Sequence, residues 1–210
     1  MAGFEDVLRA ITRTGADPDW GVIGPNIVPL LPRRRRLPAG ADCLNVLLPP
    51  GIMTSFGIDT GPAVMYVGEE ALDRWSIDAG QLTARALANV RLRTERARPR
   101  DVTRDSIEGI PIRVFQSGEG VASALLLVPD ELIRLFGNAP QRIIVPMRDL
   151  IVSMGVEAEP GLAVWLNEEL ASLDPNGLAV EPFCFDGTEL RLDPAGRQPY
   201  SGGGLIHGIG

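Results

Sequence analysis

The sequence predicts an α+β domain with a mostly antiparallel or mixed sheet, packed helices and a C-terminal β-hairpin. Strand-like and helix-like segments follow one another irregularly, without the steady strand–helix alternation of a doubly wound parallel sheet. Two turn signals, at residues 117–120 and 186–187, join pairs of apolar runs as hairpin turns do. Because 45% of the 210 residues are hydrophobic, the chain can bury a core without disulfides or metals.

In the first half, helical spacing of apolar residues predicts a short amphipathic helix at the N-terminus, over residues 4–14. Apolar, β-branched runs bounded by glycine and proline predict three strands, at residues 22–31, 44–48 and 63–67. A helical turn is expected at residues 69–75, and Asp78 is expected to cap a longer helix that runs through Arg93. A polar, proline-containing connection follows, so an internal boundary is possible near residues 96–105.

The second half is more regular. Apolar runs predict strands at residues 110–115, 121–128, 142–147 and 150–154. Helices are expected at residues 129–137, which begin with Pro-Asp-Glu, and at residues 161–173, which precede Pro-Asn-Gly. Phe183 and Phe185 face Thr188 and Leu190 across a two-residue loop suited to a type I′ turn. We therefore expect one α+β domain over residues 1–198 and a flexible, glycine-rich tail over residues 199–210.

Single-residue counts exclude several kinds of chemistry. All 20 basic residues are arginine, so no lysine is present for a Walker motif, a Schiff base or a general base. His207 is the one histidine, and it lies in the glycine-rich tail, where we expect no catalytic role. Two widely separated cysteines and that histidine do not form a zinc or iron–sulfur motif. We therefore expect no catalytic residue, no cofactor and no metal.

Charge and hydropathy restrict the partners. A net charge of −7 argues against nonspecific nucleic-acid binding, because neutralisation of phosphates supplies most of that affinity. No stretch approaches the roughly 18 to 20 apolar residues of a membrane span. The first residues include Glu5 and Asp6, where a secretory signal has basic charge. We expect a cytoplasmic protein that binds neither nucleic acid nor membranes.

Gly118-Glu119-Gly120 resembles a truncated dinucleotide-binding loop. That fingerprint must open a helix, whereas this tripeptide precedes a strand-like run, so we interpret it as a hairpin turn.

A run of four arginines, Arg33, Arg34, Arg35 and Arg36, is one candidate binding element. Prolines on both sides favour an extended, exposed backbone. Four consecutive guanidinium groups suit an anion, a phosphate or an acidic partner. The alternative is a solvated loop or strand end.

Asn89, Arg148 and Asp149 are the other candidates. Asn89 falls inside the apolar stripe of its helix, so we expect its amide to be buried and to tie the helix to a loop or a sheet edge. Arg148 and Asp149 stand between two apolar strands, where they mark a turn or a sheet rim. We expect an internal salt bridge that fixes this turn, and a ligand-facing pair is the alternative.

These segments carry a resemblance to a family. The stretches that carry it are Tyr66-Val67, Trp75-Ser-Ile77, Ala86-Leu-Ala-Asn-Val90, Ala122-Ser-Ala-Leu-Leu-Leu127, Pro146-Met-Arg-Asp-Leu150 and Leu178-Ala-Val-Glu-Pro-Phe-Cys-Phe-Asp-Gly187. In this order, over about residues 20–192, the chain resembles the YtpQ-like family of uncharacterised bacterial proteins. The resemblance implies a compact cytosolic domain. It also supports Asn89, Arg148 and Asp149 as candidate residues, because they lie within the matching stretches, but it implies no activity. The arginine run and the tail depart from the family pattern.

Two classes of function fit these observations. The first is a non-catalytic binding or accessory module that acts through protein–protein interaction, with homo-oligomerisation left open. The second is a carboxylate-based, Mg²⁺-dependent hydrolase or transferase, with the metal on Asp59, Asp149 or Asp186. We favour the first class, because the second requires distant acids to converge in the fold.

Overall fold

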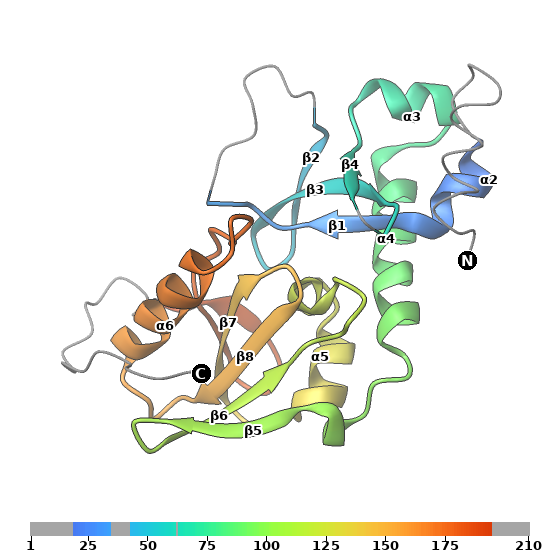
Figure 1. The fold of residues 1–210 in the computed structure, drawn as a ribbon. Helices are drawn as coiled ribbons and strands as arrows, with labels where there is room; N and C mark the ends of the chain where they lie inside the picture. The colour runs from blue at the N-terminus through green and yellow to red at the C-terminus, as the bar shows by residue number, and fades with distance from the viewer. Residues whose placement is uncertain (1–18, 35–42, 62, 195–210) are drawn as a thin grey trace.

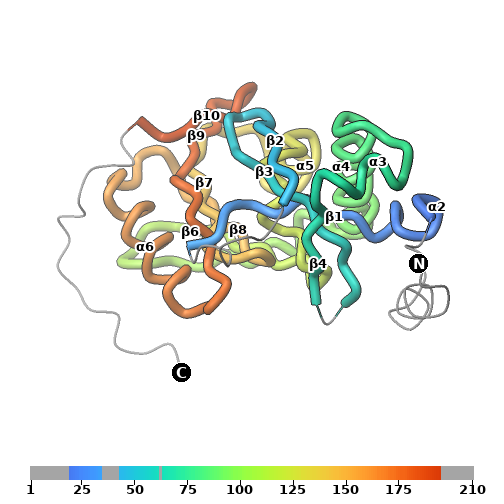
Figure 2. The backbone as a smooth tube through the Cα atoms, turned by 90° about the horizontal axis from the view of Figure 1, so that it is seen from above, coloured from blue at the N-terminus to red at the C-terminus, as the bar shows by residue number. Residues whose placement is uncertain are grey.

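Two antiparallel sheets with packed helices make up the described part of this computed structural model, residues 19–34, 43–61 and 63–194 (Figure 1). The predicted α+β class is confirmed. Seen from above, α2 (Trp20–Ile23) and α6 (Pro160–Ser172) lie at opposite ends of the molecule with the sheets between them (Figure 2). The helix expected at residues 4–14, the tail at 199–210, Arg35, Arg36 and His207 lie outside the described residues.

The first sheet is built around its longest strand. Its strands are β1 (Ile27–Leu30), β2 (Asn45–Leu48), β3 (Ile52–Asp59) and β4 (Val64–Tyr66), and β3 pairs antiparallel with the other three. Strand β3 was not predicted, because glycine, serine and threonine interrupt its apolar residues. Glycine is required at position 57 because side chains of the neighbouring strands approach its Cα closely. A Cβ would lie 2.4 Å from Val64 Cγ1 and 2.9 Å from Leu30 Cδ1.

The strand expected at residues 22–31 is shorter than predicted. Its first part forms the end of α2 and a 3-10 turn, η1 (Gly24–Asn26). Pro25 lies at the start of that turn, where a fixed φ and a missing N–H are tolerated.

Two helices follow the first sheet, α3 (Glu70–Trp75) and α4 (Ala79–Thr94). Asp78 caps α4 as predicted. Its carboxylate accepts the backbone N–H of Gln81 at 2.7 Å, and the Gln81 side chain accepts the N–H of Asp78 at 2.9 Å, which forms a capping box. The helix packs on β1 and then extends toward the second sheet (Figure 1).

The second sheet has the strand order β10-β9-β7-β8-β6-β5, and all neighbours are antiparallel. The strands are β5 (Thr103–Ile107), β6 (Ile110–Phe115), β7 (Gln141–Met147), β8 (Leu150–Gly155), β9 (Phe183–Phe185) and β10 (Leu190–Leu192). The predicted terminal hairpin is present as β9 and β10, and Phe183 and Phe185 are fully buried. Its loop, residues 186–189, is longer than the expected two-residue turn, so Phe185 pairs with Leu190 and not with Thr188. Helix α5 (Pro129–Phe136) and helix α6 cover opposite faces, because Ile143 packs with the α5 cluster and Ile144 with the α6 cluster.

Two segments of the second half differ from the prediction. Residues 121–128 are not a strand, because Ala122–Leu127 form a 3-10 helix, η3, whose six residues are all buried. Complete burial removes the polar–apolar periodicity that distinguishes a helix from a strand. Conversely, β5 was not predicted as a strand, because its residues are mostly polar and exposed. The connection expected before it contains the short turn η2 (Pro99–Asp101).

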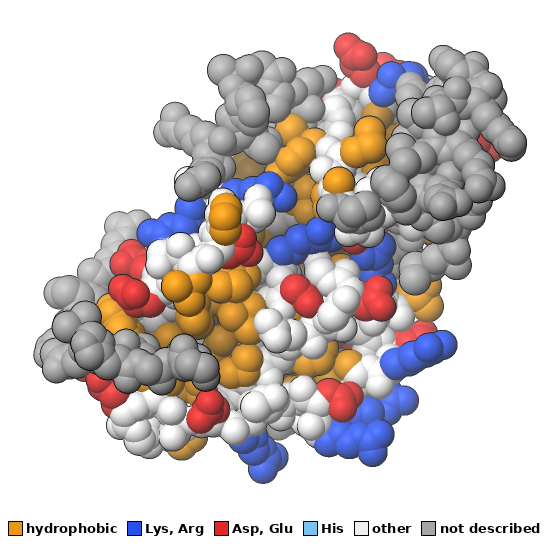
Figure 3. All heavy atoms as spheres, viewed as in Figure 1, with side chains coloured by type: hydrophobic (Ala, Val, Ile, Leu, Met, Phe, Trp, Pro, Cys, Tyr) orange, Lys and Arg blue, Asp and Glu red, His pale blue; other side chains and the backbone are white. Residues whose placement is uncertain are grey.

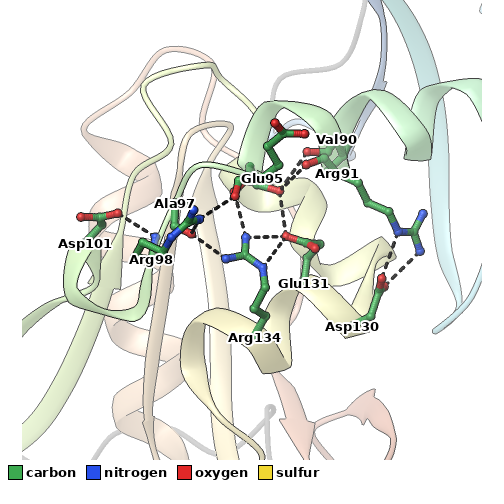
Figure 4. Close-up of polar contacts among 10 residues, drawn as sticks. Val90, Arg91, Glu95, Ala97, Arg98, Asp101, Asp130, Glu131 and Arg134 are labelled. Atoms are coloured by element: carbon green, nitrogen blue, oxygen red, sulfur yellow. Dashed lines mark hydrogen bonds and ion pairs between the residues drawn. The ribbon is translucent and has the colours of Figure 1, made fainter.

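Buried contacts cross the boundary considered near residues 96–105. Leu31, Ile52 and Val90 of the first half share one apolar cluster with the leucines of η3 and with α5. Polar contacts also join the end of α4 to α5 (Figure 4). Arg134 donates to the carbonyls of Thr94 and Ala97, at 2.8 and 2.5 Å, and pairs with Glu131 at 2.6 Å. None of the helices in the described ranges is long and apolar enough to cross a membrane.

Candidate functional site

A pocket of about 360 Å³ lies where the two sheets meet. It contains two of the arginines singled out from the sequence, Arg33 after β1 and Arg148 in the turn between β7 and β8. We call it the junction pocket, and it is lined by Pro29, Leu30, Leu31, Arg33, Gly61, Ala63, Val64, Ser123, Arg148, Asp174, Asn176 and Leu178. On the face drawn in Figure 3, basic side chains gather along the boundary between the two halves, beside apolar side chains.

Arg148 is held by an aspartate of the first sheet. Its Nη2 lies 2.8 Å from Asp59 Oδ2, and Arg93 Nη1 of α4 lies 2.7 Å from the same oxygen. Asp59 and Arg93 have 9% and 8% of their side-chain surface exposed, whereas Arg148 has 28%. Two guanidinium groups therefore share one buried carboxylate, and one of them, that of Arg148, lines the junction pocket.

The environment of Asp59 stabilises its charged form. Burial acts to raise the pKa of this carboxyl, but the hydrogen bond from Arg93, the amide of Gly61 and the charges of Arg148 and Arg93 outweigh it. The net effect is a pKa below the ordinary value for aspartate.

Asp149 has a different role from Arg148, and the predicted salt bridge between them is wrong. Each residue of this two-residue turn has its own partners, and among the described residues no ion pair joins the two. The Asp149 carboxylate accepts the backbone N–H groups of Ser117, Gly118 and Ala122 at 3.1, 2.8 and 3.2 Å, together with the Ser117 hydroxyl. These bonds replace a charged partner, because several N–H donors stabilise a carboxylate as an arginine does.

The loop around Gly118-Glu119-Gly120 thus surrounds the carboxylate of Asp149, which is an anion of the protein itself. It connects β6 to η3, so the predicted hairpin turn is wrong, and the loop does not open a nucleotide-binding helix either. Gly120 has φ +67°, and a Cβ at this position would lie 3.2 Å from the Arg148 guanidinium carbon. Glycine is therefore required for the loop to pack against Arg148.

The arginine run is partly engaged. Arg33 is half-buried, donates to Asn176 Oδ1 at 3.0 Å and lies over the ring of Tyr66, 5.7 Å from its centroid. Arg34 is exposed and donates to the carbonyl of Glu168 at 2.8 Å. Arg33 therefore faces the junction pocket from a fixed position, whereas Arg34 lines a second pocket beside α6.

Asn89 has the structural role expected from its place in the apolar stripe. Its side chain is 4% exposed, and Nδ2 donates to the carbonyls of Gly24 and Ile27, both at 2.8 Å. These bonds tie α4 to the turn that precedes β1. Asn89 does not line the junction pocket.

The acids considered for a metal have separate partners. Asp59 binds two arginines, Asp149 binds the β6–η3 loop, and Asp186 accepts from Thr188 and Glu189 in the hairpin turn. Within the ranges that the structure covers, no group of three His, Cys, Asp or Glu side chains is placed to hold a metal ion.

Two residues of this site were missed or misinterpreted in the sequence. Arg93 was expected only as the end of a helix, and Asp59 only as a metal ligand. The single local signal for Asp59 is its place at the end of a strand.

No protein-family model, no curated protein and no solved structure matches this chain. The resemblance to the YtpQ-like family stays a prediction. The case for function therefore rests on the geometry of the junction pocket.

Proposed function

We propose that the protein is a cytoplasmic, non-catalytic binding module that recognises a partner protein through the junction pocket. One observation carries the proposal: Arg33 and Arg148, distant in sequence, line one pocket together with apolar side chains. Arginine and apolar side chains together are typical of the energetically important centre of protein interfaces.

The carboxylates of this region support binding rather than acid–base or metal chemistry. A general acid needs a raised pKa, whereas the pKa of Asp59 is lowered. A metal ion at Asp59 would have to displace two guanidinium groups that contact the same oxygen. Asp149 is likewise occupied, because three backbone amides and a hydroxyl already donate to it.

Affinity capture from the cells that make the protein tests this proposal. The immobilised wild-type chain is compared with Arg33→Gln and with the control Arg100→Gln, since Arg100 is 86% exposed and lies outside the pocket. We expect a partner whose recovery, measured by mass spectrometry, falls about tenfold with Arg33→Gln and not with Arg100→Gln. If every captured protein is recovered equally by all three, the proposal is wrong.

A thermal melt tests the alternative function. A ligand held at about 100 times its Kd stabilises a protein by about 2.7 kcal/mol. We expect no rise in Tm with Mg²⁺, and a rise of several degrees would favour the metal-dependent hydrolase or transferase instead.

A further inference from the structure

The charges around the junction pocket are unbalanced. Arg33, Arg148 and Asp174 are its charged lining residues, and Asp174 Oδ1 already accepts the N–H of Asn176 at 2.8 Å. Arg33 has only neutral partners in the described part of the chain, the Asn176 amide and the Tyr66 ring. The charge of Asp59, which pairs with Arg148, is shared with a second arginine, Arg93. The pocket therefore carries an excess of positive charge, in a protein whose net charge is −7.

Arg148 also has unused hydrogen-bonding capacity. A guanidinium has five N–H donors, and in the described structure Arg148 donates only through Nη2, to Asp59. Its Nε is buried without a partner among these residues, and so is Nε of Arg93. These buried Nε groups are not accessible to an anion in the pocket. Nη1 of Arg148, in contrast, is not among the buried atoms and has no acceptor among the described residues, so an anion in the pocket can accept from it.

Apolar side chains also line the pocket, and the space is small. Leu30, Val64 and Leu178 line the same pocket as the two arginines. A volume of about 360 Å³ is near the lower end of the roughly 300–1,000 Å³ of ligand pockets. An internal peptide segment has to enter and leave such a pocket, whereas a chain end only has to enter.

From these observations we infer that the junction pocket binds the free C-terminal carboxylate of the partner, with an apolar last residue. The carboxylate lies between Arg33 and Arg148, since arginine forms strong charge-assisted bonds with carboxylates. The last side chain contacts Leu30, Val64 and Leu178. This inference rests on the proposed function, because it names the part of the partner that the pocket recognises.

Titration of the full chain with small probes tests the inference, with amide NMR shifts as the readout. N-acetyl-L-leucine carries the apolar side chain and the free carboxylate, and N-acetyl-L-leucinamide differs only in lacking the charge. N-acetyl-L-aspartic acid α-amide carries its one carboxylate on the side chain, and inorganic phosphate carries charge without an apolar group. We expect N-acetyl-L-leucine to bind in the millimolar range, given its size, and roughly tenfold more tightly than each of the other three.

Substitutions test whether N-acetyl-L-leucine binds in the junction pocket. Arg33→Gln is expected to weaken N-acetyl-L-leucine about tenfold and to leave Tm unchanged, because Arg33 is only half-buried and has neutral partners. Arg148→Gln is expected to weaken it similarly, whereas Arg100→Gln leaves it unchanged. Equal affinity for the acid and its amide, or binding that is insensitive to both pocket variants, overturns the inference.

The capture and titration experiments distinguish failure of the proposed binding function from failure of the carboxylate inference. If capture of a partner depends on Arg33 but the acid binds no better than the amide, the binding module stands and the carboxylate inference is wrong. If the acid binds selectively but no captured protein depends on Arg33, the pocket chemistry stands and a protein partner is wrong. Tighter binding of phosphate or of the aspartate derivative contradicts recognition of a chain terminus.

Discussion

Asp59→Asn is expected to destabilise the protein strongly, although it conserves the size of the side chain. The buried carboxylate accepts from Arg93 at 2.7 Å and from Arg148 at 2.8 Å. Removing its charge leaves two guanidinium groups without a counter-ion, and breaking a buried ion pair in this way costs about 3–5 kcal/mol. Because Arg148 is 28% exposed and partly solvated, we expect a loss near the lower limit, about 3 kcal/mol.

Urea unfolding and thermal melting measure this loss. For a chain of this length, about 3 kcal/mol corresponds to a fall in Tm of roughly 6–12 °C. Asp130→Asn is the matched control, since Asp130 also pairs with an arginine, Arg91, but at 60% side-chain exposure. We expect the control to lose about 1 kcal/mol or less. Equal losses for Asp59→Asn and Asp130→Asn would refute the argument that burial increases the contribution of the Asp59 ion pairs to the free energy of unfolding.

The same carboxylate predicts a pH dependence. The pKa of Asp59 is lowered in the folded state, so its contribution is fully present above the ordinary aspartate pKa of about 3.9 and is lost as the pH falls through the lower folded value. Wild-type stability is therefore expected to fall more steeply than that of Asp59→Asn as the pH decreases below about 4. Parallel acid-unfolding curves would contradict this assignment.

Three further predictions concern other buried groups. Phe185→Ala is expected to cost about 3–5 kcal/mol in urea unfolding, because the ring is fully buried, whereas Leu192→Ala at a 46% exposed position should cost less than about 1 kcal/mol. Asn89→Ala should cost about 1–3 kcal/mol by removing two buried hydrogen bonds, and a neutral result would contradict the structural role of the amide. Burial and the nearby Asp193 raise the pKa of Cys184 to about 11, so alkylation by iodoacetamide at pH 8 should be roughly a hundredfold slower than in the urea-unfolded chain; equal rates would exclude the raised pKa.

Local signals predicted those elements whose residues show one buried face. Helix α4 was predicted from its apolar stripe and its cap at Asp78, and the β9–β10 hairpin from the turn signal Asp186-Gly187 after Phe183 and Phe185, although the strand register differs from the predicted one. Helix η3 has no exposed face, so periodicity could not identify it, and in β3 glycine, serine and threonine interrupt the apolar residues. Sequence periodicity reports a difference in polarity between the two faces of a helix or strand. A segment in the centre of the fold is apolar on both faces, so this difference is small.

The candidate site was predicted only in part, for a related reason. The burial and role of Asn89 follow from its position within one helix. The partner of Arg148, in contrast, is Asp59, 89 positions away, and nothing near either residue indicates the other. The sequence instead favoured the adjacent Asp149, whose partners are backbone amides that no side-chain pattern reveals.

The polar character of β5 has a consequence for the behaviour of the protein at high concentration. This strand forms one edge of the second sheet, and its first four residues, Thr103 to Ser106, are exposed. An unpaired edge is a template on which another polypeptide can add a strand, which is how sheets grow into aggregates. Arg104 and Asp105 oppose such growth, because a strand added there would bring charged side chains into a contact between chains. The residues that made this strand hard to detect thus protect the sheet from unlimited extension.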